Sequence, residues 1–352
     1  MGFPVGKSGP FPRLSRLLSR LALLLAAAAL VAGCTGGPGK GAGDAGAAAP
    51  APGAQDTGDQ GAANPSGADP SGGTGAQGAT WPMTVTDDEG RTVTIPAEPR
   101  RILSLAPSNT EILFALGLGD RVVGVDNFSD YPPEAASLPR VGDLMNPNYE
   151  AMAALSPDLA LAIGGSEEFW QKLEELGVPV VVIQPNTVAE VIDSIRLVGR
   201  VTGAAEAADA LARSMADRVE AVQHQAARLS HRPRVFWEVW DDPLMSAGPG
   251  SFFDDMIRLA GGVNVVGDAE SPWPQVSPEA VIARDPEVII TTQAEWAERL
   301  RSGALPAWSG TTAVRQGRIY VVEDNLVSRP GPRIVEGLEQ VARAIQSQGA
   351  GR

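Results

Sequence analysis

Cysteine and histidine are nearly absent from this chain of 352 residues, which contains one cysteine, Cys34, and two histidines, His224 and His231. One cysteine cannot form an internal disulfide. A structural zinc site is also improbable, because such sites use several cysteine and histidine ligands. The sequence also lacks the HExxH, Walker A and GxSxG motifs, and neither histidine accompanies a Ser or Cys nucleophile at a recognisable turn. We therefore predict that the chain is not an enzyme, and we assign it no catalytic residue, no metal ligand and no cofactor.

Basic residues are the second shortage. The chain has 28 Lys and Arg against 42 Asp and Glu, a formal net charge of −14, and no basic run follows the N-terminal segment. Binding to nucleic acid needs a basic footprint for the phosphates, so this balance disfavours nucleic acid as a partner. It also disfavours polybasic adhesion to a membrane, so any membrane attachment has to come from a lipid.

Residues 1–33 have the pattern of a signal peptide. A basic start precedes an apolar run, Leu21–Ala32, that is too short to span a membrane. The run leads into Val31-Ala32-Gly33-Cys34, which resembles the bacterial lipobox and so implies cleavage before Cys34 and its lipidation. A lone buried thiol is the alternative, but it fits poorly directly after an apolar run. We expect Cys34 to anchor the protein on the outer face of the cytoplasmic membrane.

Residues 34–80 follow as a segment of Gly, Ala, Pro, Ser and Asp with almost no larger apolar side chain. Such a segment cannot bury enough surface to offset the entropy of ordering it, so we predict a disordered tether behind the lipidated cysteine. The folded part then begins near Trp81, and its length suits two domains of ordinary size.

The longest periodic stretch runs from Gly203 to Ser230. Apolar residues recur there at alternating steps of four and three, which predicts a helix with one narrow stripe: Ala208, Ala212, Met215, Val219, Val222, Ala226 and Leu229. At 1.5 Å per residue this helix would be roughly 40 Å long. A coiled-coil seam or a surface helix would show the same stripe. Because strand–helix patterns of similar size flank the stretch, we predict that it joins two lobes.

Short links connect alternating strands and helices in both halves, which predicts mostly parallel sheets covered on both faces. The predicted fold class is α/β, with two lobes joined by one long α-helix and a ligand cleft between them. We place the N-terminal lobe at residues 81–201, the inter-lobe helix at 202–231 and the C-terminal lobe at 232–352. In the first lobe, Ser108 and Glu111 have the spacing of a capping box.

One helix–proline–strand unit occurs in both halves. Asn148-Tyr149-Glu150-Ala151 and Ser277-Pro278-Glu279-Ala280 each begin a short helix, and in each unit the Glu lies seven positions before the proline that ends the helix. An acidic residue in a first turn is common, because it suits the helix dipole. The matched pair, Glu150 and Glu279, is what suggests a shared function.

Aromatic residues make up only 5% of the chain, yet several lie on loops between predicted elements. Trp240 ends a strand and Trp273 lies in a proline-flanked turn. Phe128 and Tyr131 follow the carboxyl end of a strand, where open α/β sheets bind ligands. Each of these rings alone could be ordinary packing, but the group predicts a binding surface.

Charged residues offer two further candidates. Arg329 and Arg333 flank Pro330-Gly331-Pro332 and could present a planar fork to a carboxylate, phosphate or amide oxygen. The acidic pairs Asp241-Asp242 and Asp254-Asp255 are interpreted as loop and helix-start residues rather than as a catalytic dyad.

Four segments resemble the binding proteins of vitamin B12 and iron–siderophore ABC importers: Ser104–Glu111, Ser129–Pro133, Pro272–Ser277 and Arg329–Arg333. The resemblance extends from about Arg100 to Val341, and the sequence Pro-Trp-Pro-Gln-Val-Ser leans toward the cobalamin branch. It implies two α/β lobes that trap a small molecule, without covalent chemistry, and deliver it to a permease dimer with ATPase subunits. It also implies that Glu150 and Glu279 dock with arginines of the permease. We expect a monomer with little lobe closure, because a long helix resists bending.

The resemblance places ligand contacts on both lobes, at Pro107, Ser108, Asn109, Phe128, Leu144, Ile163, Trp240, Met245, Trp273, Arg329 and Arg333. Trp273 matches an aromatic contact of the cobalamin proteins and Phe128 a tyrosine contact. Leu144, Ile163 and Met245 stand where those proteins have further aromatics. The predicted ligand is cobalamin or a related corrinoid, which is transported cargo and not a cofactor.

Other interpretations stay open. A ferric siderophore is the alternative ligand, with Arg329, Arg333 and Arg140 facing an anionic chelate, whereas haem fits less well because neither histidine lies near the predicted cleft. From other classes of protein, a cell-surface hydrolase would use the acidic loops, and an adhesion or sensor protein would need no small molecule.

Overall fold

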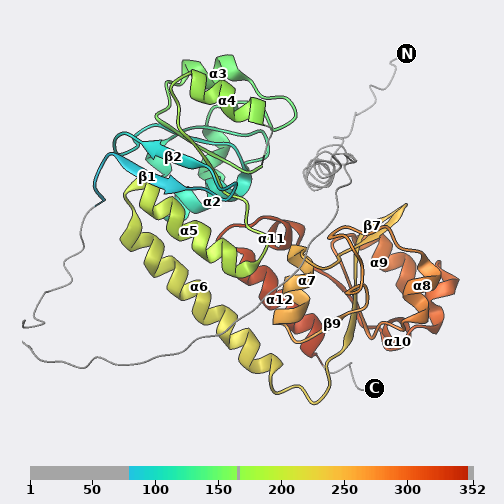
Figure 1. Cartoon of the computed structure of the whole chain (residues 1–352). Coiled ribbons are helices and arrows are strands. Elements are labelled where there is room, and N and C mark those ends of the chain that lie inside the picture. Colours follow the sequence, from blue (N-terminus) through green and yellow to red (C-terminus); the bar gives the residue numbers. More distant parts are fainter. Residues whose placement is uncertain (1–78, 165–166, 348–352) are drawn as a thin grey trace, which may run out of the picture.

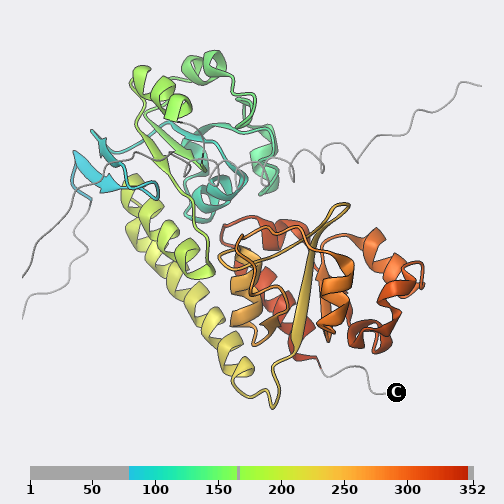
Figure 2. The same ribbon diagram turned by 45° about the vertical axis from the view of Figure 1, so that its right-hand side comes forward.

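The computed structural model describes residues 79–164 and 167–347, which fold into two α/β lobes (Figure 1). The predicted signal peptide, Cys34 and the tether up to residue 78 lie outside the described residues. The N-lobe, at the top of Figure 1, contains strands β1 to β6, and the C-lobe, at the lower right, contains strands β7 to β11. Two antiparallel helices, α5 (Val188–Thr202) and α6 (Ala205–Ala226), run along one side of both lobes (Figure 2).

A four-stranded parallel sheet in the order β4-β3-β5-β6 forms the centre of the N-lobe. All residues of β3, β5 and β6 are buried, as expected for strands covered on both faces. An antiparallel hairpin pairs β1 (Met83–Thr86) with β2 (Thr92–Ile95). The other elements are β3 (Ile102–Ser104), α2 (Pro107–Ala115), η2 (Gly119–Arg121), β4 (Val122–Val125), η3 (Pro133–Ser137), α3 (Tyr149–Ala154), β5 (Leu159–Ala162), α4 (Glu167–Glu175) and β6 (Val180–Val182).

The C-lobe sheet has the order β11-β10-β7-β8, and β9 pairs with the start of β7. Its pairs are parallel except that of β7 with β8, which is antiparallel. Its elements are β7 (Arg234–Asp241), β8 (Leu244–Ser246), α7 (Phe252–Leu259), β9 (Val263–Asn264), α8 (Pro278–Ala283), β10 (Val288–Thr291), α9 (Ala294–Arg301), η4 (Pro306–Gly310), α10 (Thr312–Arg315), β11 (Ile319–Val321), α11 (Asp324–Ser328) and α12 (Ile334–Gln346).

Helix α6 is shorter than the stretch 203–230 predicted for it. It has 22 residues, which is about 33 Å at 1.5 Å per residue. Gly203 adopts a left-handed φ of 76° and ends α5, so the chain turns there before α6 begins. Four residues of the predicted stripe are buried: Ala208, Ala212, Met215 and Val222. In the part of the chain that the structure describes, no helix is both long enough and apolar enough to span a membrane.

The two helices join the lobes as a pair. Helix α6 packs on α7 and α12 of the C-lobe, whereas α5 packs on α2 of the N-lobe and on α7 of the C-lobe. At the start of α5, the N–H of Val188 donates to Asp255 Oδ2 of α7 at 2.9 Å. Buried residues of both lobes belong to one hydrophobic cluster, which includes Ile95, Ile195 and Trp237. The predicted single connecting helix is therefore one half of a two-helix joint.

Candidate functional site

Helix α2 carries three predicted ligand residues at its start. It begins at Pro107 after Ala106, without a side-chain cap, so the predicted capping box of Ser108 and Glu111 is wrong. Proline suits the first position of a helix because its missing N–H would have no intrahelical partner. Ser108 and Asn109 are buried, and neither amide atom of Asn109 has a hydrogen-bond partner among the described residues. An uncapped helix start and an unsatisfied amide can both bind a polar group.

A buried carboxylate, Asp126, follows β4 and organises the loop that carries Phe128. It accepts hydrogen bonds from the Ser129 hydroxyl and from the Phe128 N–H, the latter at 2.9 Å. Burial raises the pKa of Asp126, although those hydrogen bonds and the nearby Arg140 guanidinium oppose the rise. The Ser129 hydroxyl also contacts the Thr110 hydroxyl of α2 at 2.7 Å, so this loop is tied to the helix.

Leu144 and Ile163 line a narrow cavity of about 10 Å³ next to Asp126. That volume is about the size of one water molecule, so any contact of these side chains with a larger ligand has to be made outside the cavity. The loop of Leu144 begins at Gly142, whose φ is 93° and where an added Cβ would lie 2.3 Å from the Asn146 carbonyl oxygen. This close approach requires glycine.

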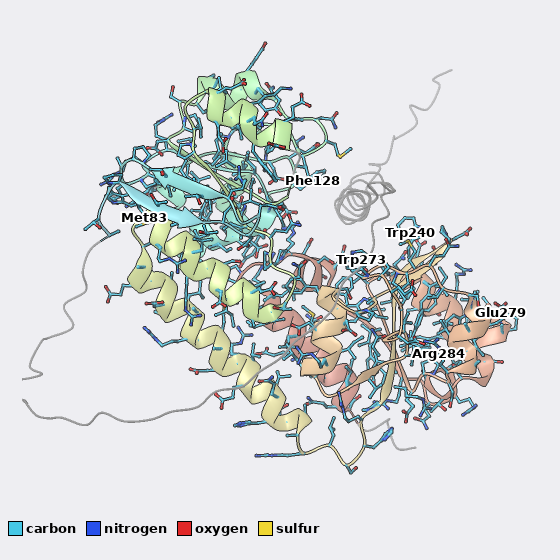
Figure 3. All side chains as sticks on the ribbon, viewed as in Figure 1. Met83, Phe128, Trp240, Trp273, Glu279 and Arg284 are labelled. Atoms are coloured by element: carbon cyan, nitrogen blue, oxygen red, sulfur yellow. The ribbon has the colours of Figure 1, made fainter. Side chains whose placement is uncertain are left out.

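Three predicted ligand residues of the C-lobe lie together at the β7–β8 edge. Trp240 is the cross-strand partner of Met245, and Met245 pairs in turn with Gln275 in the segment that carries Trp273. Trp273 packs edge-on against Phe253, with ring centroids 5.6 Å apart, and both Trp240 and Trp273 are half-buried. In Figure 3, these two tryptophans lie on the side of the C-lobe that faces the N-lobe, and Phe128 lies on the facing side of the N-lobe.

Arg329 and Arg333 link the two lobes. Arg333 Nε and Nη2 donate to both carboxylate oxygens of Glu111 in α2, at 2.9 and 2.6 Å. Arg329 Nη1 donates to Asp130 at 2.6 Å, and the ring of Tyr131 lies 3.7 Å from the Arg333 guanidinium carbon. The two cations predicted to face a ligand therefore already have carboxylate partners.

Glu111 is the residue of this site that the sequence interpretation missed. Its side chain is only 2% exposed, although it precedes the apolar residues Ile112 and Leu113 in α2. A charged residue inside an apolar helix segment requires a buried partner. That signal was present in the sequence, but the spacing to Ser108 suggested a cap instead.

Glu150 and Glu279 are exposed residues in the first turns of α3 and α8. Both helices have side-chain caps: Asn148 Oδ1 accepts from the Ala151 N–H, and Ser277 Oγ accepts from the Ala280 N–H. Figure 3 places Glu279 at the outer end of the C-lobe, away from Trp273. The matched helix–proline–strand units are confirmed as α3–β5 and α8–β10.

The acidic pairs have structural partners. Asp241 forms an ion pair with Arg299 at 2.9 Å, and Asp254 accepts a hydrogen bond from Asn264 Nδ2 at 2.8 Å. Within residues 79–164 and 167–347, no group of three or more His, Cys, Asp and Glu residues is arranged to hold a metal ion.

The sequence matches the family model of periplasmic binding proteins over residues 102–326. An uncharacterised ABC transporter substrate-binding lipoprotein of Bacillus subtilis is 37% identical over 273 residues, which cover 75% of this chain and 86% of that protein. The crystal structure of the periplasmic vitamin B12-binding protein of Vibrio cholerae has a TM-score of 0.63 at 32% identity, covering 71% of this chain and 98% of that one. A periplasmic haem-binding protein of Roseiflexus has a TM-score of 0.62 at 31% identity, covering 70% and 98%. Proteins of this fold are thus named for different ligands.

Proposed function

Because this chain belongs to the periplasmic binding protein family, we propose that it is the extracytoplasmic solute-binding subunit of an ABC importer, with cobalamin or a related corrinoid as its ligand. The observation that carries the ligand proposal is the group of Trp240, Met245 and Trp273 at one edge of the C-lobe, facing the side of the N-lobe that carries Phe128. Aromatic rings and a thioether provide flat, adaptable apolar surface that suits a broad macrocycle. Similarity to a vitamin B12-binding protein supports the same ligand class.

The N-lobe would supply the opposite wall. Asn109 and the uncapped start of α2 at Pro107 and Ser108 offer polar groups for the amide side chains of a corrinoid. Leu144 and Ile163 would add aliphatic surface in place of aromatic rings.

A ferric siderophore is the weaker candidate. It would need free cations, but Arg329 and Arg333 are paired with Asp130 and Glu111. The remaining candidate, Arg140, donates from Nη1 to the carbonyl oxygens of Asp126 and Ser129. These internal partners favour an uncharged or weakly charged face on the ligand, as a corrinoid presents.

A thermal-shift titration with cyanocobalamin, cobinamide, haem and a ferric siderophore tests the ligand. At a ligand concentration of 100 Kd, a native-state binder should stabilise the protein by about 2.7 kcal/mol. We expect that shift with a corrinoid, its loss in Trp273→Ala, and its partial retention in Trp273→Phe, which keeps a ring. A shift with the ferric siderophore alone would mean that the ligand is an iron chelate, and a shift with haem alone would mean that it is a porphyrin.

Docking on the permease is proposed for Glu150 and Glu279, because they are exposed on equivalent helices of the two lobes. We expect the double variant Glu150→Ala/Glu279→Ala to lose transport and retain corrinoid affinity. Transport that survives in the double variant would remove this role from both residues.

A lipid anchor at Cys34 is proposed from the lipobox-like sequence, and the name of the Bacillus relative supports it. In cells that are fed an alkyne-labelled fatty acid, the protein should acquire the label. The variant Cys34→Ser should not acquire it. Label that persists in Cys34→Ser would contradict the anchor.

A further inference from the structure

We propose that Arg101 and Arg234 are positioning residues that fix the helices α3 and α8, and thereby the placement of Glu150 and Glu279 on the permease. This inference rests on the docking role proposed above. We call these two residues the C-capping arginines, because each one donates hydrogen bonds to the carbonyl groups of the C-cap residue of one helix and of the residue after it.

In the N-lobe, Arg101 directly precedes β3 and reaches the end of α3. Its Nε donates to the carbonyl oxygens of Leu155 and Ser156, both at 3.0 Å, and its Nη2 donates to that of Leu155 at 2.6 Å. The backbone of Arg101 is held on the other side by Asp158, whose carboxylate accepts from the Arg101 N–H at 2.9 Å and whose N–H donates to the Arg101 carbonyl at 2.8 Å.

In the C-lobe, Arg234 is the first residue of β7 and does the same for α8. Its Nε donates to the carbonyl oxygens of Arg284 and Asp285, at 3.2 and 2.9 Å. Glu287 takes the place of Asp158: its carboxylate accepts from the Arg234 N–H at 2.9 Å, and its N–H donates to the Arg234 carbonyl at 2.8 Å. Figure 3 labels Arg284 and Glu279, which lie near opposite ends of α8.

The backbone conformation is matched as well. Ser156 and Asp285, the carbonyl-bearing residues just beyond the two helices, have φ values of 45° and 44°. Neither is glycine, so each adopts a left-handed conformation that is unfavourable for a residue with a side chain. In both lobes, the residue with this uncommon conformation accepts a hydrogen bond from one of the C-capping arginines, which indicates one repeated structural unit.

Neither helix can fix its own orientation. Each has six residues, which is too short to be stable in isolation, and each buries one side chain, Met152 in α3 and Val281 in α8. Partly buried side chains such as Tyr149 and Ile282 also pack on the lobes, and the hydrogen bonds at the helix ends add to this packing in fixing the orientation. A guanidinium group also satisfies otherwise unpaired C-terminal carbonyls and interacts favourably with the helix dipole.

The two lobes differ in how strongly this end is held. Asp285 accepts hydrogen bonds from the Thr312 N–H and hydroxyl and from Arg234, and the two bonds from Thr312 lower the pKa of its carboxyl group. The N-lobe equivalent, Ser156, has no carboxylate, and Arg101 forms no ion pair among the described residues. Loss of Arg101 should therefore disturb α3 more than loss of Arg234 disturbs α8.

The test uses the full chain loaded with cyanocobalamin and its permease–ATPase complex in nanodiscs. We expect Arg101→Met to weaken docking about tenfold and Arg234→Met to weaken it less, with cyanocobalamin affinity within twofold of wild type in both. Arg101→Lys should restore only part of the docking, because lysine keeps the charge without the planar fork. Arg100→Met is the matched control, because this neighbouring side chain is exposed and forms an ion pair with Glu98.

A double-mutant cycle separates positioning from general destabilisation. If Arg101 acts through Glu150, docking by Arg101→Met/Glu150→Ala should be no weaker than docking by Glu150→Ala alone. Additive losses, or an equal loss of cyanocobalamin affinity, would overturn the inference. Normal docking of Arg101→Met, with docking lost in Glu150→Ala/Glu279→Ala, would overturn the inference and leave the proposed docking face standing. Normal docking of all these variants would overturn both.

Discussion

Asp126 holds the Phe128 loop with a carboxyl group that is buried next to the proposed site. Its folded-state pKa is raised above the ordinary value of 3.8, mainly by burial. The stabilising contribution of the protonated form is therefore complete below the unfolded pKa and is lost as the pH rises through the folded pKa.

We expect Asp126→Asn to remove this pH dependence. Wild type should lose stability relative to the variant as the pH rises from the ordinary Asp pKa through the raised folded value. Urea unfolding of both proteins at a series of pH values measures the difference, and Asp120→Asn, at an exposed position, is the control. Parallel stability curves for wild type and Asp126→Asn would contradict the prediction.

Glu111 is the second residue whose replacement has a defined outcome. Its side chain is 2% exposed and accepts two hydrogen bonds from Arg333. Glu111→Gln leaves a largely buried guanidinium without its counter-charge, and breaking such a pair costs about 3 kcal/mol. Urea unfolding should show this loss, while Glu98→Gln, in more exposed pairs with Arg100 and Arg121, should lose less than about 1 kcal/mol. Equal effects of the two substitutions would show that the inter-lobe pair is no stronger than a surface one.

At the residue scale, the sequence located side chains better than it located their partners. Trp240, Met245 and Trp273 were predicted for one site, and the structure brings them to one edge. Arg333 was predicted to face a ligand, but it binds Glu111, which lies 222 positions away. Local spacing carries no information about a partner at that separation, so the cation was assigned to a ligand and the carboxylate to a cap.

Close packing of α5 and α6 depends on one glycine. A Cβ at Gly199 would lie 2.2 Å from the Cβ of Ala208, so the two helices could not keep their separation. We expect Gly199→Ala to destabilise the protein by about 1–3 kcal/mol, despite the better helix propensity of alanine, because overpacking costs that much. Differential scanning calorimetry or urea unfolding measures the loss.

The compensating variant makes this prediction specific. Gly199→Ala/Ala208→Gly moves the methyl group to the other helix and should recover much of the lost stability. Gly310→Ala is the control, because an added Cβ there meets no atom within 4 Å. A double variant that is less stable than Gly199→Ala would mean that the contact between these two residues is not the cause.

At the scale of elements, periodic and buried segments were predictable and short edge elements were not. Helix α12 (Ile334–Gln346) covers the apolar stretch near the C-terminus, and the parallel sheets follow the predicted strand–helix alternation. Strand β8 has three residues and β9 has two. Their strand conformation comes from pairing with β7, and no local period of two or 3.6 residues can reveal pairing of that kind.

The whole molecule has two lobes, and one of the three hydrophobic clusters among the described residues extends through both of them. That cluster runs from the β1–β2 hairpin of the N-lobe through α5 and α6 to α12 of the C-lobe. The Glu111–Arg333 pair and the Val188–Asp255 hydrogen bond add polar links between the same lobes. Opening one lobe against the other would expose part of a shared core, and little lobe closure therefore stays our prediction.

The shared core predicts one cooperative unfolding transition for the whole described part of the chain. At about 0.7 kcal/mol per residue near 60 °C, its unfolding enthalpy should be roughly 190 kcal/mol. The calorimetric enthalpy should equal the van't Hoff enthalpy, because equality of the two marks a single cooperative unit. Lobes that unfold independently would give a van't Hoff value near half the calorimetric one, or two peaks. The variant Glu111→Gln removes a contact that only the two folded lobes can make together, so it tests the same point. With a shared core, the variant should lower the temperature of the single transition. Without one, it should separate the transitions of the two lobes.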